Sequence, residues 1–385
     1  MRFHRFLLLA ATLGALAPMA NAVPITPASD AEVIDVLPAA TGDRAGVRHL
    51  RQQLARQPHD AALALAAAKR WLAQARELGD PRFAGMALAA LAGWPDAATA
   101  PDEVLMLRAT LQQYLHEFEA SAATLQALLA RRGAARPQAW LTLATVRRVQ
   151  GRYRESDAAC AQLARAGAAL HARACAAENA ALRGDVALAR AAFTLLQADA
   201  RQPAATRAWL STSVAELEQR AGRPAAAEAA YRAALALDPD PYTTLSYADF
   251  LIEQQRPARA LALLKGQPRS DAVLLRLAIA GTQARVPTAA ADAAEMRERI
   301  ALANERPDAK LLHGREQAMF ALAVDGDAVR ALELARGNVA QQRESLDLVV
   351  LAQAAKASGR PAAVDEARRL IRAIGLVDQR IKEVL

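Results

Sequence analysis

The sequence predicts an all-α protein in which tandem helix-turn-helix hairpins stack into a solenoid. Hydrophobic residues make up 53% of its 385 residues, but aromatic residues only 4%. Alanine dominates stretches such as residues 61–68, and it is the strongest helix former and allows close helix packing. A GC-rich genome would also raise the alanine and arginine content. The second observation is a short glycine-led phrase that recurs at the spacing of a helical hairpin.

Residues 1–22 have the three parts of a secretion signal. Arg2 and Arg5 precede an apolar stretch at residues 6–16, and small residues follow at 20–22. We expect cleavage after Ala22 and a periplasmic or secreted mature protein, with no integral membrane segment after cleavage. An uncleaved anchor is the alternative, although the apolar stretch is shorter than the roughly 20 residues that span a bilayer. Residues 23–40 would form a linker or partial repeat.

The recurring phrase predicts a solenoid over residues 41–374. Its clearest copies begin at Gly79, Gly151, Gly184, Gly222, Gly326 and Gly359, with degenerate copies at His116 and Gln255. Most neighbouring copies are 33 to 38 residues apart, and the longer step after Gln255 leaves room for a diverged turn near Val286-Pro287. Glycine tolerates left-handed backbone, so it can end a first helix and let the chain reverse.

Residues at fixed places of these copies carry a family resemblance. The copy that starts at Ala208 places small, aromatic and proline residues at Ala215, Gly222, Ala227, Tyr231, Ala234 and Pro239. The copies that start at Pro137 and Leu170 share this register through Trp140, Leu143, Gly151, Tyr153, Gly184, Ala189 and Phe193. With its period near 34 residues, the pattern resembles the tetratricopeptide repeat (TPR). The resemblance implies a right-handed superhelix, because one hairpin cannot bury its apolar face alone.

The chain's last stretch, residues 375–385, is predicted to be a capping helix. Its charged residues are expected on the solvent-facing side of that helix, because charged side chains are seldom buried. They are Asp378, Arg380, Lys382 and Glu383.

The two cysteines are predicted to form a disulfide. Cys160 and Cys175 are placed symmetrically about Gly167-Ala168, where the chain should turn between two antiparallel helices. Residues so placed face each other, and export leads to an oxidising compartment. The alternative is a pair of small buried thiols, since cysteine often acts as a core hydrophobe.

Catalytic, metal and nucleic-acid motifs are missing from the sequence. None of the six histidines forms a metal-binding pair, and no nucleophile elbow or phosphate-binding glycine loop is present. The net charge of +8 arises from 48 basic and 40 acidic residues that are interspersed, without the clustered basic footprint of a nucleic-acid-binding protein. We therefore expect no catalytic residues, metal or cofactor, and no nucleic-acid partner.

The TPR resemblance places a binding groove on the first helices, where family members usually hold proteins or peptides. The corresponding positions here are Gln113, Thr145, Arg148, His171, Glu178, Trp209, Thr212, Glu216, Gln219, Ser246 and Phe250. Trp209 is the candidate anchor, because tryptophan is enriched among binding hot spots, although it could instead complete the packing of its own repeat. Arg148 and Arg220 could pair with acidic groups of a partner, or could be solvated arginines.

These features predict a non-enzymatic scaffold or adaptor of the cell envelope that binds a protein or peptide partner. The alternative is a membrane-associated structural subunit of an envelope or secretion assembly, anchored by an uncleaved N-terminal helix.

Overall fold

The structure, a computed structural model, describes residues 44–78, 80–131, 136–305 and 314–385. The predicted signal (1–22), the linker (23–40) and the turn at Gly79 lie outside the described residues. The chain divides into two compact units, Met1–Gln52 and Gln53–Leu385. In the first unit the structure describes the beginning of α1 (Arg44–Arg56). All features below belong to the second unit.

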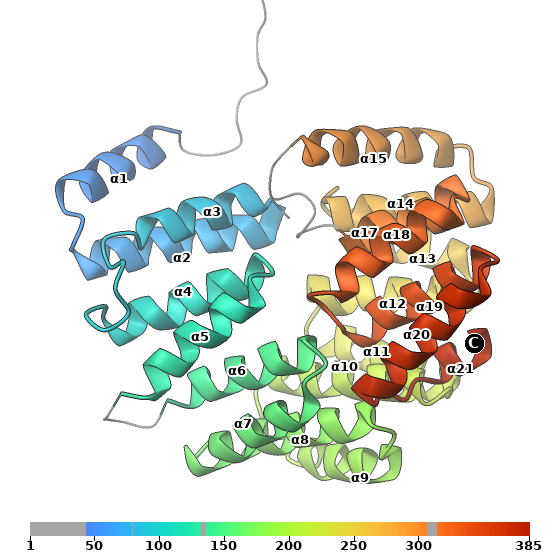
Figure 1. Cartoon of the computed structure of the whole chain (residues 1–385), viewed down its shortest axis with the longest axis horizontal. Helices are drawn as coiled ribbons and strands as arrows, with labels where there is room; N and C mark the ends of the chain where they lie inside the picture. The colour runs from blue at the N-terminus through green and yellow to red at the C-terminus, as the bar shows by residue number, and fades with distance from the viewer. Residues whose placement is uncertain (1–43, 79, 132–135, 306–313) are drawn as a thin grey trace, which may run out of the picture. The chain divides into compact units, whose positions relative to one another are not determined.

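Helices of the second unit pack in consecutive antiparallel pairs (Figure 1). The first helices are α2 (Ala61–Leu78), α4 (Asp102–Tyr114), α6 (Pro137–Val149), α8 (Ala169–Leu182), α10 (Ala204–Arg220), α12 (Pro241–Glu253), α14 (Asp271–Ala284), α17 (Gly314–Phe320) with its π-helical continuation η1 (Ala321–Asp325), and α19 (Ser345–Ala357). The second helices are α3 (Pro81–Ala90), α5 (Phe118–Leu129), α7 (Tyr153–Arg165), α9 (Val186–Gln197), α11 (Pro224–Leu237), α13 (Pro257–Leu264), α15 (Ala289–Asn304), α18 (Ala328–Val339) and α20 (Pro361–Ile374). A short α21 (Gln379–Val384) follows. With no strand among the described residues, the predicted all-helical repeat fold is confirmed.

The turns inside the pairs coincide with the recurring phrase of the sequence. In each described case one residue takes a left-handed φ, namely His116, Gly151, Gly184, Gly222, Gln255, Arg285, Gly326 and Gly359. Arg285 directly precedes the diverged Val286-Pro287 turn that the sequence predicts. A left-handed residue ends the first helix and reverses the chain, so these residues set the register of the repeats.

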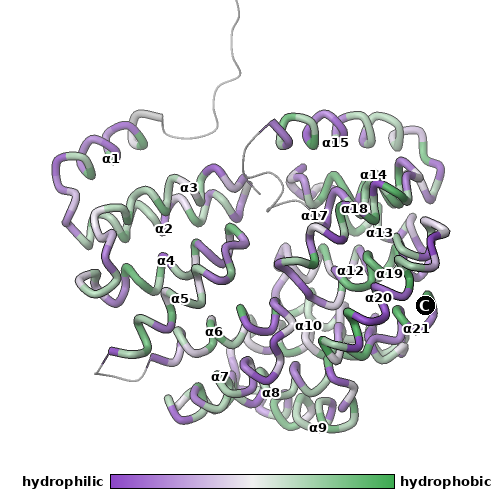
Figure 2. The backbone as a smooth tube through the Cα atoms, viewed as in Figure 1, coloured by the Kyte–Doolittle hydropathy of each residue, from purple (hydrophilic) through white to green (hydrophobic). Residues whose placement is uncertain are grey.

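Small residues let the two helices of a pair approach closely. Ala215 of α10 and Ala227 of α11 are fully buried, and Tyr231 fills the space beside them. Hydrophobic and hydrophilic residues are interspersed along every helix, as expected for helices that bury one face each (Figure 2). The family pattern of small and aromatic places therefore describes packing inside each hairpin.

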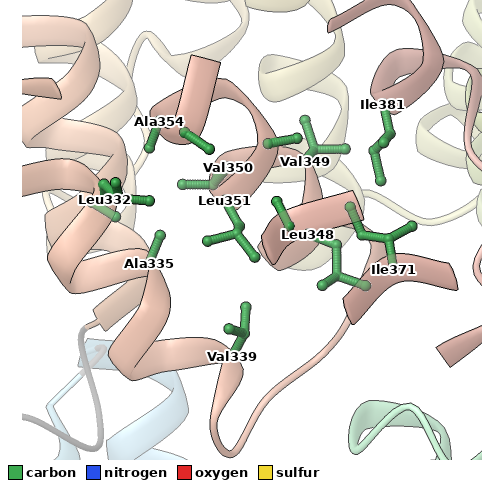
Figure 3. Close-up of a cluster of buried hydrophobic side chains, with 14 of the residues drawn as sticks. Leu332, Ala335, Val339, Leu348, Val349, Val350, Leu351, Ala354, Ile371 and Ile381 are labelled. Atoms are coloured by element: carbon green, nitrogen blue, oxygen red, sulfur yellow. The ribbon is translucent and has the colours of Figure 1, made fainter. Parts of the chain in front are cut away.

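The largest part of the C-terminal core lies between α18, α19, α20 and α21. Leu332, Leu348 and Ile371 are among its buried residues, and Figure 3 shows them converging from these helices. The same cluster includes Tyr153 of α7 and Leu182 of α8. The last repeats therefore share a core with repeats far earlier in the chain.

Candidate functional site

Residues 374–380, which we call the closing segment, dock on the ends of earlier first helices. The Val377 amide donates a hydrogen bond to the Leu182 carbonyl at the end of α8, with N and O 2.8 Å apart. Nearby, the Arg343 amide just before α19 donates to the Val149 carbonyl at the end of α6, at 2.7 Å. Carbonyls in the last turn of a helix have no partner within it, so the chain's own C-terminal part supplies donors to α6 and α8.

Arg380 holds this docking together, and it corrects the expectation that Asp378 and Arg380 face solvent. Its guanidinium contacts the Glu253 carboxylate of α12 at 2.8 Å and the Asp378 carboxylate at 2.7 Å. It also donates to the Ser345 hydroxyl of α19 at 2.9 Å. Asp378 is only 2% exposed and caps α21 by accepting the Arg380 amide. The side chains turn inward because a buried cation and two carboxylates satisfy one another there. Lys382 and Glu383 are exposed as expected.

The buried ion pairs shift the pKa values of their members. Burial alone would lower the pKa of Arg380, but the charges of Glu253 and Asp378 raise it above its ordinary value. Burial opposes ionisation of Asp378 as well, yet Arg380 and the Ser345 hydroxyl hold the pKa of that carboxyl below its usual range. Both groups therefore stay charged at neutral pH.

Beside the docked closing segment lies a pocket of about 450 Å³, which we call the polar pocket. Its wall comes mainly from first helices, from α6 to α19, with Arg380 of α21. This volume is within the range of about 300–1,000 Å³ typical of ligand sites. The predicted groove is thus a pocket in this part of the chain, because residues of the C-terminal repeats form part of its wall together with the earlier first helices.

Most charged groups in the polar pocket wall pair with one another. Arg276 of α14 contacts Asp249 of α12 at 2.6 Å, and Arg148 of α6 pairs with Glu178 of α8. Arg315 of α17 pairs with Glu344 beside α19. Since each pair joins two different helices or hairpins, the charges fix how the wall segments lie against one another.

Glu216 and Tyr242 form a hydrogen-bonded pair on the wall. The Tyr242 hydroxyl donates to Glu216 Oε1 at 2.6 Å. Burial raises the pKa of Glu216, and the charge of Arg220 and the hydrogen bond from Tyr242 lower it in part. Tyr242 is 62% exposed although it lines the pocket, so its ring faces a space that water can enter.

The structure brings most of the predicted groove residues together. Eight of them line the polar pocket, namely Thr145, Arg148, Glu178, Trp209, Thr212, Glu216, Gln219 and Ser246. Gln113 of α4 lies outside this wall. His171 is exposed and stacks on Trp209, with ring centroids 5.7 Å apart. Trp209 lines the pocket, as the anchor reading expects, and it also packs against the cluster between α10 and the preceding α8–α9 hairpin rather than inside its own repeat.

Phe250 does not line the groove, which corrects that expectation. It is fully buried against Tyr231 and Tyr247. Its neighbour Asp249 faces the pocket instead. The register of α12 is offset by one residue relative to the family pattern, and on a helix one residue turns the side chain by about 100°.

Other residues of the polar pocket were not among those predicted from the sequence. Arg315, Glu344, Ser345 and Arg380 belong to the last repeats, and Tyr153 and Tyr242 begin helices. The family pattern assigns groove positions to each repeat separately. It carries no information on which distant repeats meet.

Cys160 of α7 and Cys175 of α8 are joined by a disulfide, with their Cα atoms 5.9 Å apart. The bond crosses between two hairpins rather than within one. It therefore links the two hairpins whose turns, at Gly151 and Gly184, face the closing segment.

The described residues also bear on metal binding and on membrane insertion. In the described ranges, no group of three or more His, Cys, Asp or Glu residues is arranged to hold a metal ion. Among the helices that the structure describes, none has the length and apolar character needed to span a bilayer.

Comparison with known proteins supports the fold. No protein-family model matches the sequence, and neither does any curated protein. A Rap protein solved in complex with competence and sporulation factor is similar in structure, with a TM-score of 0.52, over 89% of this chain and 93% of that chain, at 12% identity. A tetratricopeptide repeat protein from Parabacteroides merdae ATCC 43184 aligns over 80% of this chain and 99% of that chain, at 11% identity and a TM-score of 0.38. At 12% identity, the likeness to the Rap protein shows a shared fold of stacked helical hairpins.

Proposed function

From this tetratricopeptide-type repeat fold, we propose that the protein binds a peptide or an extended segment of a partner protein in the polar pocket. The observation that carries the proposal is the pocket itself: about 450 Å³ lined by successive first helices and by residues of the docked C-terminal repeats. The wall combines the Trp209 indole with hydroxyl and amide side chains such as Ser246 and Gln219. Such a mixture suits a polypeptide, which offers apolar side chains and main-chain hydrogen-bonding groups together.

A bounded pocket narrows the kind of partner. The C-terminal repeats supply part of the pocket wall, which leaves less of the concave first-helix face for the surface of a folded partner. A short segment can enter a pocket of this size and leave the rest of its chain outside. The Rap protein that shares the fold was solved in complex with competence and sporulation factor, which supports a binding role for this architecture. We propose that this chain works by binding rather than by catalysis.

We further propose that binding takes place in the cell envelope, after removal of residues 1–22. The Cys160–Cys175 disulfide supports this location, because disulfides persist in oxidising compartments and are rare in the cytosol. Mass spectrometry of the protein from a periplasmic fraction should find Val23 at the N-terminus. A full-length N-terminus in the membrane fraction would instead favour the anchored structural subunit.

Retention of a pooled random octapeptide library tests the binding proposal. The wild-type protein should retain a subset of the peptides, and Ser246→Trp should abolish retention by filling the polar pocket. Leu195→Trp is the matched control, because Leu195 is 75% exposed on α9 and does not line the pocket. Equal retention by wild type and Ser246→Trp would place binding elsewhere, and no retention by wild type would refute the proposal.

A further inference from the structure

Arg220, at the end of α10, differs from the other arginines of the polar pocket. Its side chain is only 11% exposed. The nearest carboxylate oxygen belongs to Glu216, 3.9 Å away, and the buried Nε has no hydrogen-bond partner among the described residues. The Nε of Arg276 is also unpaired, but its guanidinium reaches a carboxylate at 2.6 Å, and Arg380 reaches two within 2.8 Å. A guanidinium carries five donors, so Arg220 is a buried cation with unused donors.

Tyr153 supplies a second unused donor in the same pocket. The residue is 4% exposed, and its hydroxyl is buried without a partner in the described part of the chain. Burial raises the pKa of Tyr153 to about 12, and the charges of Arg220 and Arg148, which line the same pocket, lower it in part. The hydroxyl therefore keeps its proton at neutral pH and can donate a hydrogen bond.

The carboxylates around Arg220 are engaged by other donors. Glu216 accepts the Tyr242 hydroxyl, and Glu178 accepts the Ser213 hydroxyl and pairs with Arg148. Asp378 and Glu344 are held by Arg380 and Arg315, respectively. Leaving buried donors unpaired costs free energy, and an acceptor brought by a ligand would offset that cost for Arg220 and Tyr153.

We infer that Arg220 and Tyr153 bind a carboxylate of the segment held in the polar pocket. Charge-assisted hydrogen bonds from arginine suit a carboxylate, which can accept from both donors at once. The carboxylate comes either from an acidic side chain or from the C-terminus of the segment. This inference rests on the proposed function and names the chemistry that the pocket recognises.

Three peptide pools separate these possibilities. The first has free C-termini and no Asp or Glu, the second has amidated C-termini and one Asp or Glu, and the third has amidated C-termini and no Asp or Glu. Wild type should retain the first or the second pool, and which of them is retained identifies the source of the carboxylate. Arg220→Gln should weaken binding of that pool by about tenfold to a hundredfold, as loss of a charged hydrogen bond predicts.

Control variants keep the outcomes distinct. Arg223→Gln should bind like wild type, because Arg223 is 54% exposed, pairs with Glu218 and does not line the pocket. Tyr153→Phe should weaken binding in the same direction as Arg220→Gln. Equal retention of all three pools, or unchanged binding by Arg220→Gln, would overturn the inference and leave the peptide-binding proposal intact. If wild type retains no pool, both fail.

A measurement without ligand completes the test. If Arg220 serves a ligand, its replacement by an apolar residue of similar length should not destabilise the free protein. Arg220→Met should therefore unfold at a urea concentration equal to or above that of wild type. A clearly lower midpoint would mean that Arg220 is a structural partner of Glu216, and the inference would be wrong.

Discussion

Two sets of turns in the same solenoid carry similar backbone geometry but meet different surroundings. At Gly151, Gly184 and Gly222 a Cβ atom would lie within about 3 Å of Ile374, Val377 or Gln379 of the closing segment. At Gly326 and Gly359 a Cβ would meet no described atom within 4 Å. Elsewhere His116, Gln255 and Arg285 hold the left-handed conformation without being glycine.

The difference shows that glycine has two roles in this chain. Wherever it occupies a described turn, it relieves the strain of a left-handed φ, which other residues can bear at a cost of roughly 1–2 kcal/mol. Among the turns between the helices of a pair that the structure describes, it also lets another part of the chain lie directly against the backbone in the three after α6, α8 and α10. Glycine at the same repeat position thus forms only a local turn in some hairpins, and in others it also forms part of the surface on which the closing segment docks.

The largest expected effect is on Arg380, which fixes the closing segment to α12. Arg380→Ala would leave Glu253 and Asp378 buried without their cation, and should lower the free energy of unfolding by about 3–5 kcal/mol. Urea denaturation followed by circular dichroism measures this. Lys382→Ala, on the exposed side of the same helix, should change it by less than about 0.5 kcal/mol. Similar small effects of both variants would mean that the docking of the closing segment contributes little.

Loss of the Cys160–Cys175 disulfide is expected to rank next. It crosslinks the hairpins on which the closing segment docks, and its residues are 15 apart in sequence. The double variant Cys160→Ala/Cys175→Ala should be less stable by about 3 kcal/mol in the chain-entropy model. Reductant should bring wild type to the same urea midpoint and leave the double variant unchanged. If reductant leaves the urea midpoint of wild type unchanged, the disulfide does not stabilise the protein.

The two sets of turns can be compared directly with one pair of variants. Gly184→Ala and Gly359→Ala should both lose about 1 kcal/mol of stability, because both glycines have positive φ. Gly184→Ala should lose about 1–3 kcal/mol more, since its Cβ would lie 3.1 Å from Val377. The comparison uses urea midpoints measured side by side. Equal losses of stability in the two variants would show that the closing segment shifts to accommodate the added Cβ without an energetic penalty.

The smallest expected effect is a gain at a turn without glycine. Gln255→Gly should raise the free energy of unfolding by about 0.5–1 kcal/mol, because Gln255 is exposed and has φ of 56°. Its neighbour Gln254 is also exposed but has φ of −79°. Gln254→Gly should therefore lower stability by about 0.5–1 kcal/mol. Changes of the same sign in the two variants would argue against strain at Gln255.

The sequence predicted the repeat architecture well because the residues that form each hairpin lie within that hairpin's own stretch of sequence. Glycine at a turn, alanine at close approaches and a larger side chain such as Tyr231 beside them are local requirements. The same pattern selected first-helix residues such as Thr212 and Glu216, which do line the polar pocket. Periodicity carries this information because neighbouring hairpins meet in the same way each time.

What the sequence did not predict is the return of the last repeats onto earlier ones. Asp378 and Arg380 were expected in solvent because charged residues usually are exposed, and no local pattern indicates that Glu253 will meet them. Phe250 was misplaced for a smaller reason, since an offset of one residue in α12 exchanges its direction with that of Asp249. Both failures arise where a repeat departs from its neighbours.

The contact between Arg380 and Glu253 joins residues 127 positions apart in sequence. In a solenoid whose units touch only their neighbours, folding can start anywhere and spread along the chain. Closing so long a loop has an entropic cost, so this contact forms once the intervening hairpins have set the distance between its ends. We therefore expect the polar pocket to be assembled late in folding, and a mutation in any hairpin of that loop to be able to disrupt it without altering one residue of its wall.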